Sequence, residues 1–524
     1  MDELLGALRK SDDKTDGIFY PHLYCVGTLE NPDRFVNDER YVSELADTVK
    51  QGDYAALLSA LSIHHELNHL SSYVSTNFGA EAYVALHQAA RSFLTSGELP
   101  RFFDAPVLRH TDIHIDDAHN VAHRFMLYAL KELSAESVFQ PKNRNQNHMS
   151  SFELWGFPHG MWRFGSQFGL APDWFDAQQM NIAEAISRSY LSPPICDYYI
   201  VNEAENAGSV RTCLNAATLF EALATLAEID LISSLTPNGI TREWAADYIN
   251  NKNVMNQAAI FVYHNMYHLP FPNIQLHLPA LIDIALMYTP MIARKENAGR
   301  TLFGNRAWWT PMDVFFEACA AARDVELIGD LSYRRGAVTR FQDAVCQRMG
   351  IPTVYELAEA GVAFLKHNYS TAFDPTTRRP GAFDITAPFA IHLTYLEGRV
   401  NEPLDWCSRN LRISFSRGIA KLYQDDLIFY DLDRKERIWL QEPDTSHLKQ
   451  PNANPMTRNT FGVQSVGNLL VDLLSGRAAT CPLKEGRPFK CWSHGYPSNV
   501  FCTIKRGDAE VRCPYTEFFG LADA

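Results

Sequence analysis

The residues with the clearest potential for chemistry stand together as His65, Glu66, Leu67, Asn68 and His69. The two histidines are four positions apart, so on a helix their imidazoles project from one face and can bind a single metal ion. Glu66 directly follows the first histidine. This position puts its carboxylate beside the metal, where it can take a proton from a water that the metal holds. The spacing therefore predicts a metal site with a general base next to it.

The segment that must position these residues has the pattern of a long helix. Residues 53–78 contain no Gly or Pro, and Ile63, Leu67 and Leu70 recur at helical spacing, with Gly79 as the expected stop. The helix is apolar on more than one side, which predicts that the polar cluster is buried. Buried imidazoles and carboxylates require partners, so we expect other elements to supply them.

The stretch from His65 to His69 resembles the His-Glu-x-x-His signature of the zincin metallopeptidases. This resemblance covers little more than one helix, and it implies zinc ligation by His65 and His69 and a base role for Glu66. Residues 70–79 contain no His, so the third-histidine pattern of the metzincins is absent. The resemblance thus implies the gluzincin arrangement, in which a Glu on a later helix is the third ligand.

Two segments offer this Glu, and their sequences echo each other. Residues 220–224 and 316–320 share Phe, Glu, Ala and a second Ala, with Glu221 and Glu317 at matching positions. Glu221 is the first candidate because its helical pattern is clean and follows the motif helix in the order that the resemblance implies. Glu317 is the alternative. We expect Glu228, about two turns beyond Glu221, to face water rather than to orient a ligand.

Other chemistries fit the same residues. Glu66 and His69 also form Glu-x-x-His, the half-site of helical-bundle di-iron carboxylate proteins, in which Glu221 and Glu317 would complete a cage for two Fe. The chain would then be an oxidase or oxygenase that activates O₂, with Glu66 as a ligand. Against this, the sequence has no second Glu-x-x-His, and His65 has no role. A third interpretation is a non-catalytic interaction protein that a metal stabilises.

The composition restricts the remaining classes. The 524 residues are 46% hydrophobic and 21% charged, which is typical of a folded globular protein. A formal net charge of −14 disfavours nucleic-acid binding. No signal-peptide pattern and no run of about 18 apolar residues is found, so we expect a cytoplasmic protein without membrane association. A zinc hydrolase of this kind would act on a peptide or protein substrate.

The chain is expected to be mainly α-helical, with a zincin-like catalytic body over residues 1–400 and a C-terminal region over residues 401–524. Residues 16–31 are expected to be irregular or to contain strands. Apolar residues three and four apart predict further helices at 116–139, 216–234, 279–289, 312–328, 353–367, 409–430 and 463–475.

The tail at residues 476–524 is expected to form a small irregular lobe. It contains four of the ten cysteines, which are Cys481, Cys491, Cys502 and Cys513. These thiols form either a structural zinc site, which would fold a lobe with little core of its own, or a set of buried, unligated cysteines.

Overall fold

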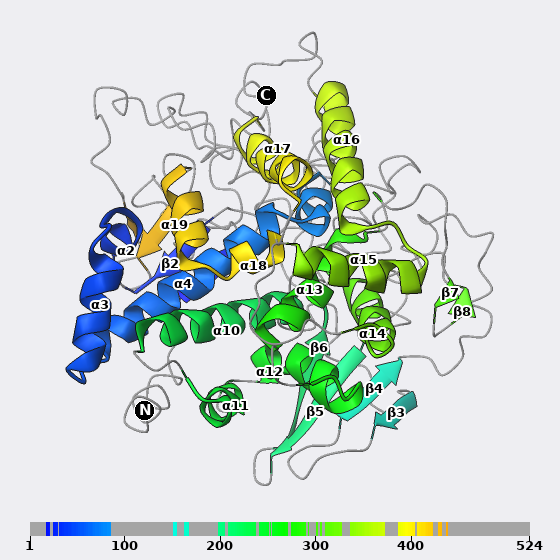
Figure 1. Ribbon diagram of the computed structural model, residues 1–524, viewed down its shortest axis with the longest axis horizontal. Coiled ribbons are helices and arrows are strands. Elements are labelled where there is room, and N and C mark those ends of the chain that lie inside the picture. Colours follow the sequence, from blue (N-terminus) through cyan, green and yellow to red (C-terminus); the bar gives the residue numbers. More distant parts are fainter. Residues whose placement is uncertain are drawn as a thin grey trace, which may run out of the picture.

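Helices dominate the structure, a computed structural model, and the prediction of a mainly α fold is confirmed (Figure 1). Within the part of the chain described below, no helix is both long enough and apolar enough to cross a membrane. The described residues are 17–20, 25–29, 31–84, 150–154, 162–166, 198–204, 208–236, 240–250, 252, 254–270, 274–289, 292, 300–301, 304–305, 310–326, 336–372, 386–403, 406–422, 428–431 and 436–438.

The helices follow one another along the chain with long gaps between some of them. They are α2 (Asp33–Asn37), α3 (Tyr41–Lys50), α4 (Ala55–Val74), α10 (Ala216–Leu235), α11 (Arg242–Asn250), α12 (Val254–Phe261), the π-helix η4 (Val262–Met266), α13 (Ile274–Met287), α14 (Pro311–Ala322), α15 (Ala337–Met349), α16 (Val354–Ala372), α17 (Thr386–Asn401), α18 (Trp406–Asn410) and α19 (Ile413–Leu422).

Four small sheets accompany the helices. One has the strand order β1-β2-β9-β10, and the other three are two-stranded antiparallel pairs. The strands are β1 (Gly17–Tyr20), β2 (Cys25–Thr28), β3 (Ser150–Leu154), β4 (Trp162–Ser166), β5 (Tyr198–Ala204), β6 (Gly208–Leu214), β7 (Arg300–Thr301), β8 (Gly304–Asn305), β9 (Ile428–Asp431) and β10 (Glu436–Ile438). The strands β1 and β2 confirm that the segment 16–31 contains strands.

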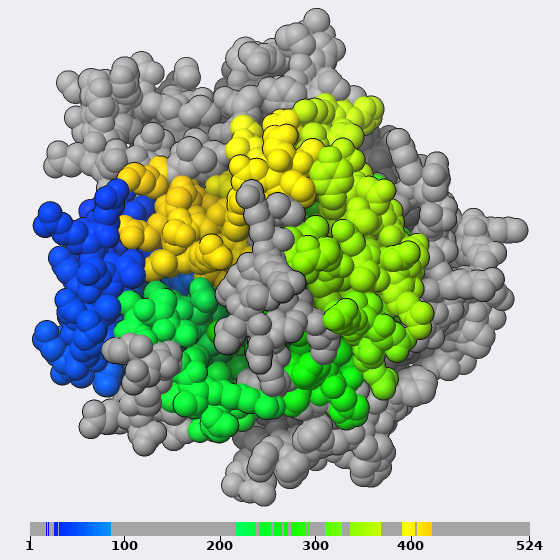
Figure 2. All heavy atoms as spheres, in the orientation of Figure 1, coloured from blue at the N-terminus to red at the C-terminus, as the bar shows by residue number. Residues whose placement is uncertain are grey.

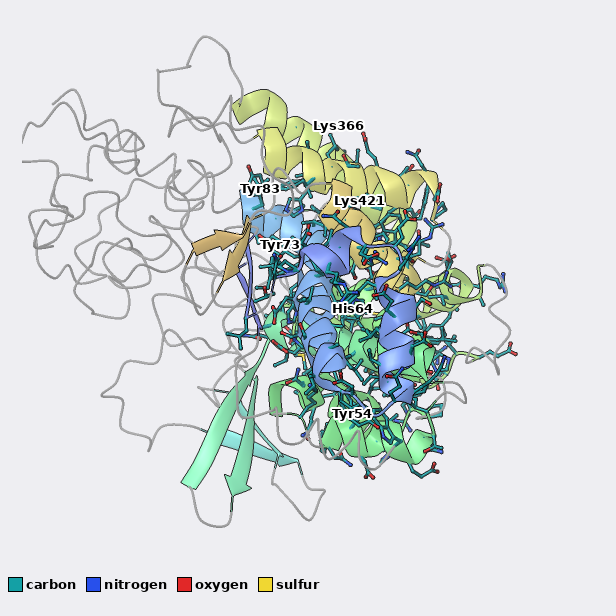
Figure 3. All side chains as sticks on the ribbon, turned by 90° about the vertical axis from the view of Figure 1, so that its left-hand side faces the viewer. Tyr54, His64, Tyr73, Tyr83, Lys366 and Lys421 are labelled. Carbon is teal, nitrogen blue, oxygen red and sulfur yellow. The ribbon has the colours of Figure 1, made fainter. Side chains whose placement is uncertain are left out.

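Helix α4, which carries the histidine pair, is buried on almost every side. Leu57, Leu67 and Leu70 have no exposed surface, and apolar burial of this kind contributes about 25 cal/mol per Å². His64 and Tyr73 lie along the same helix, among the packed side chains of the body (Figure 3). A helix held so firmly can keep its polar side chains in fixed positions.

Helix α10 packs alongside α4 and supplies the second wall of the site (Figure 1). It begins with a capping box, because the Asn215 side chain accepts from the Thr218 amide and the Thr218 hydroxyl accepts from the Asn215 amide. A cap of this kind stabilises a helix by about 1 kcal/mol. Leu219, Leu226 and Ile232 then bury themselves completely, so both the start and the packing of α10 are fixed.

Elements from beyond residue 400 complete the covering of α4. Helix α19 packs on both α4 and α2, and the segment 406–422 lies beside the N-terminal helices on the face shown in Figure 2. Strand β9 pairs in parallel with β2, with Phe429 opposite Val26. The division of the chain at residue 400 stays a prediction, but the described residues on its two sides share one sheet.

Several predicted boundaries differ from the structure. Helix α13 begins five residues before the predicted 279, with Pro279 inside it, and α14 ends at Ala322 rather than at 328. The prediction of one helix over 409–430 was wrong, since two short helices are followed there by β9. The predicted helices 216–234 and 353–367 are present as α10 and α16. Those at 116–139 and 463–475 lie outside the described residues.

The expected stop at Gly79 was also wrong. Helix α4 ends at Val74, and a second helical stretch covers residues 77–84 and passes through Gly79. A Cβ atom on Gly79 would overlap the carbonyl oxygen of Tyr73 and lie 3.2 Å from Cε1 of His392. Gly79 is therefore required for the close approach of two backbone segments at this break, and not for ending the helix.

Replacing Gly79 by Ala is expected to lower the free energy of unfolding by about 1 to 3 kcal/mol, because the methyl group overpacks a buried backbone contact. The matched control is Gly418→Ala, since Gly418 lies inside α19 with nothing within 4 Å of an added Cβ. That variant should be about 0.5 to 1 kcal/mol more stable than the wild type, as expected for Gly→Ala in a helix. Urea unfolding followed by circular dichroism measures both. Equal effects would contradict the assigned role of Gly79.

Candidate metal centre

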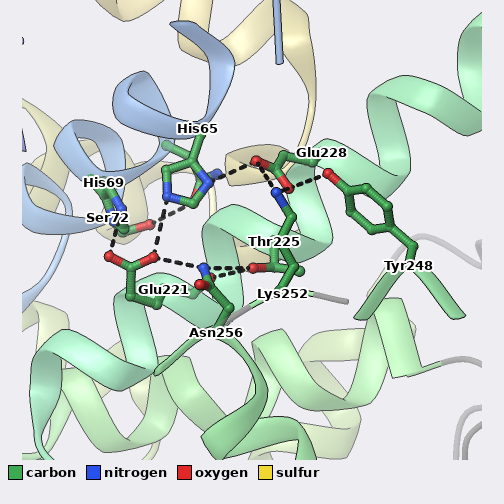
Figure 4. A network of polar contacts seen from close by, with 10 residues as sticks. His65, His69, Ser72, Glu221, Thr225, Glu228, Tyr248, Lys252 and Asn256 are labelled. Atoms are coloured by element: carbon green, nitrogen blue, oxygen red, sulfur yellow. Dashed lines mark hydrogen bonds and ion pairs between the residues drawn. The ribbon is translucent and has the colours of Figure 1, made fainter. Parts of the chain in front are cut away.

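His65 and His69 lie one turn apart on α4 and both face the carboxylate of Glu221 on α10 (Figure 4). The Nε2 atom of His65 is 3.3 Å from one oxygen of Glu221, and the Nε2 atom of His69 is 3.4 Å from the other. The centres of the two imidazole rings are 4.6 Å apart, and the rings are nearly perpendicular. Three potential ligands, two nitrogens and a carboxylate, thus converge on one point.

Glu66 lies beside this point without being tied to it. Its potential ligand oxygen and those nitrogens of His65 and His69 all lie within 4.8 Å of one another. Glu66 is only 6% exposed, and among the described residues its Oε2 atom has no hydrogen-bond partner. Burial raises the pKa of Glu66, although the neighbouring histidines oppose the shift. The carboxyl group is therefore free to exchange a proton.

Strand β1 forms the wall next to Glu66 and His69. A Cβ atom on Gly17 would lie 2.7 Å from Cγ of Glu66 and 2.8 Å from the hydroxyl oxygen of Ser62, so a side chain at position 17 would push the base out of place. The ring of Phe19 stacks on that of His69, with 6.4 Å between the ring centres. The N-terminal strand thus limits where the base and one histidine can move.

Glu228 holds the other side of His65. Its Oε1 atom accepts a hydrogen bond of 3.0 Å from Nδ1 of His65, which leaves Nε2 to face Glu221. Burial alone would raise the pKa of Glu228, but Lys252, then His65 and Tyr248, lower it to about 2. Glu228 is only 4% exposed, so the expectation that it faces water was wrong. A carboxylate in this position fixes both the tautomer and the orientation of a ligating histidine.

His64 shows that neighbouring histidines on α4 differ in role. It is fully buried on the side of α4 where its ring packs against Phe35. Burial lowers the pKa of His64 to about 4. It is therefore a neutral core residue, while His65 points into the polar cluster.

The charges around the histidines require a cation. If Glu66, Glu221 and Glu228 are all ionised, Lys252 neutralises one of them, and two negative charges remain in a largely buried cluster. Burial alone would lower the pKa of His65, but Glu221 and Glu228 outweigh this effect and hold it well above its ordinary value. A proton on His65 supplies one positive charge, whereas a divalent metal ion supplies two. The nitrogen and oxygen donors also suit Zn²⁺, so these residues fit the metal that the sequence predicted.

The other candidate ligands are not part of this cluster as described. Glu317 lies on α14, close enough to Tyr267 that its charge, added to burial, helps to raise the pKa of that phenol. Glu221, and not Glu317, is the downstream carboxylate that contacts both histidines. Cys481, Cys491, Cys502 and Cys513 lie outside the described residues, so their predicted zinc site stays a prediction.

Several residues of the site were not identified from the sequence. Tyr248, Lys252 and Asn256 contact the two glutamates of α10, and their even spacing of four residues is a weak signal that was overlooked. Gly17 and Phe19 carry no signal, because their roles arise from contacts with a helix about fifty residues away.

Comparison with known proteins adds no assignment. No protein-family model matches the chain, and neither a curated protein nor a solved structure matches it. The interpretation of the cluster therefore depends on its own geometry and chemistry.

The choice between the two candidate third ligands can be tested by metal content. Glu221→Gln removes a charged ligand without changing its shape and is expected to lower bound zinc well below the approximately one ion per chain predicted for the wild type. Glu317→Gln is the matched control and should leave the zinc content unchanged. Elemental analysis after dialysis measures both. Loss of zinc in the Glu317 variant alone would contradict the assignment of Glu221.

Proposed function

We propose that this chain is a metal-dependent hydrolase that cleaves a peptide or amide bond, with His65, His69 and Glu221 as ligands of Zn²⁺ and Glu66 as the general base. The observation that carries the proposal is the contrast between the two glutamates. Glu221 contacts both histidines, whereas Glu66 lies beside them with a buried oxygen that has no partner among the described residues.

The chemistry divides between the ion and Glu66. A bound Zn²⁺ would lower the pKa of a water molecule toward about 7 and polarise the substrate carbonyl. Glu66 would take a proton at its Oε2 atom and deliver it to the amide nitrogen as the C–N bond breaks. Its raised pKa suits both steps, because a base that later acts as an acid works best with a pKa near the working pH.

The di-iron alternative has less support. It needs Glu66 as a ligand and Glu317 as a further one, and the carboxylate found against the histidine pair is Glu221. Glu228, which might replace Glu317, already contacts His65, Tyr248 and Lys252. A site for one metal ion therefore accounts for more of the contacts than a site for two.

The role of Glu66 is tested by Glu66→Gln, which keeps the shape of the side chain but cannot accept the proton. We expect peptide cleavage to fall about 10²- to 10⁴-fold while the zinc content stays near one per chain. Cleavage of a mixed-sequence peptide library, followed by mass spectrometry, measures activity without knowledge of the substrate.

Glu44→Gln is the control for this experiment, because Glu44 is an exposed glutamate on α3. It should retain full cleavage. Loss of metal from the Glu66 variant would identify Glu66 as a ligand and favour the oxidase alternative.

A further inference from the structure

Three side chains at four-residue intervals reach the glutamates of α10 from one neighbouring segment. Tyr248 lies on α11, Lys252 follows that helix, and Asn256 lies near the start of α12 (Figure 4). Tyr248 and Asn256 are each 3% exposed, and the side chain of Lys252 is 16% exposed. Polar groups buried to this extent are normally held by defined partners.

Tyr248 and Lys252 act on Glu228. The Tyr248 hydroxyl donates to Oε2 of Glu228 at 2.6 Å, and the Lys252 ammonium lies 3.1 Å from Oε2 and 3.4 Å from Oε1. His65 uses the other face of Oε1. Both oxygens of Glu228 are thus occupied, so the carboxylate cannot turn toward a metal ion without losing these contacts. It stays an acceptor for Nδ1 of His65.

Asn256 acts on Glu221. Its side-chain amide donates to Oε2 of Glu221 at 2.7 Å and to the hydroxyl oxygen of Thr225 at 3.1 Å. The Thr225 hydroxyl in turn donates to the backbone carbonyl of Glu221 at 2.9 Å, so its oxygen is fixed as an acceptor. The plane of the Glu221 carboxylate is therefore set from the side opposite the histidines.

Packing makes this segment stiff. The rings of Trp244 and Tyr248 are stacked with their centres 5.4 Å apart, and the Lys252 ammonium lies 4.9 Å from the centre of the Tyr248 ring. Stacking and cation–π contacts restrict the rotamers of both side chains. A phenol, an ammonium and an amide are thus presented to the two glutamates with little freedom.

We infer that Tyr248, Lys252 and Asn256 form a positioning strip that sets the metal affinity of the site by holding Glu228 and Glu221 against His65 and His69. The inference rests on the proposed function only in requiring that a metal ion binds there. None of the three side chains touches the reacting atoms. Contacts of this kind typically change metal affinity or activity about 10- to 100-fold when they are removed.

The test compares Tyr248→Phe and Asn256→Ala with the wild type, with Zn²⁺ affinity measured by chelator competition. Each variant should bind zinc about 10- to 100-fold more weakly. The optical spectrum of bound Co²⁺, which depends on the arrangement of its ligands, should shift in both. Lys252→Met should weaken binding as well, and Lys252→Arg, which keeps the charge, should restore part of the affinity.

Two matched controls separate positioning from general stability. Tyr395→Phe removes a hydroxyl from another buried tyrosine, which lies on α17, and Lys366→Met removes an exposed lysine that pairs with Glu397. Both should bind zinc as tightly as the wild type, and far-ultraviolet circular dichroism should show that all variants are folded. Because Tyr248→Phe removes a single oxygen atom, it should fold even if Lys252→Met does not.

The outcomes distinguish this inference from the proposed function. Wild-type affinity and an unchanged Co²⁺ spectrum in folded Tyr248→Phe and Asn256→Ala would overturn the positioning strip and leave the hydrolase proposal standing. A wild-type protein that binds no metal would overturn both. Weakened binding in the two variants but not in the controls is the result that we expect.

Discussion

The structure around the site depends on one constraint, which is the enclosure of several ionisable side chains between α4 and α10. Glu66 and Glu228 are almost completely buried, and Glu221 is partly buried. Charges taken out of water destabilise a fold unless they are paired and hydrogen-bonded. The two histidines, Lys252 and a bound cation together meet that requirement, so the metal is as much a condition for this arrangement as a tool for catalysis.

The same constraint separates the roles of the three glutamates. Glu228 is occupied by His65, Tyr248 and Lys252, and Glu221 is divided between the histidines and Asn256. Glu66 alone keeps a buried oxygen without a described partner. The fold therefore assigns one carboxylate to orientation, one to ligation and one to proton transfer through the partners that each of them has.

The sequence predicted the local features of this site and little of its long-range organisation. The helix carrying His65 and His69, and the helix carrying Glu221, follow from the spacing of apolar residues, because helical periodicity is a local property. The contact between Glu228 and His65 joins residues 163 positions apart, and no local pattern reveals it. Gly79 shows the limit in another way, since its role depends on a backbone contact that only the folded chain contains.

The central claim, that His65, His69 and Glu221 hold one metal ion with Glu66 left free, is tested most directly by anomalous X-ray diffraction from crystals of the zinc-loaded protein. The account predicts one anomalous peak about 2.0 to 2.2 Å from the Nε2 atoms of both histidines and from one oxygen of Glu221. No peak at this position, or two peaks bridged by Glu66, would contradict it.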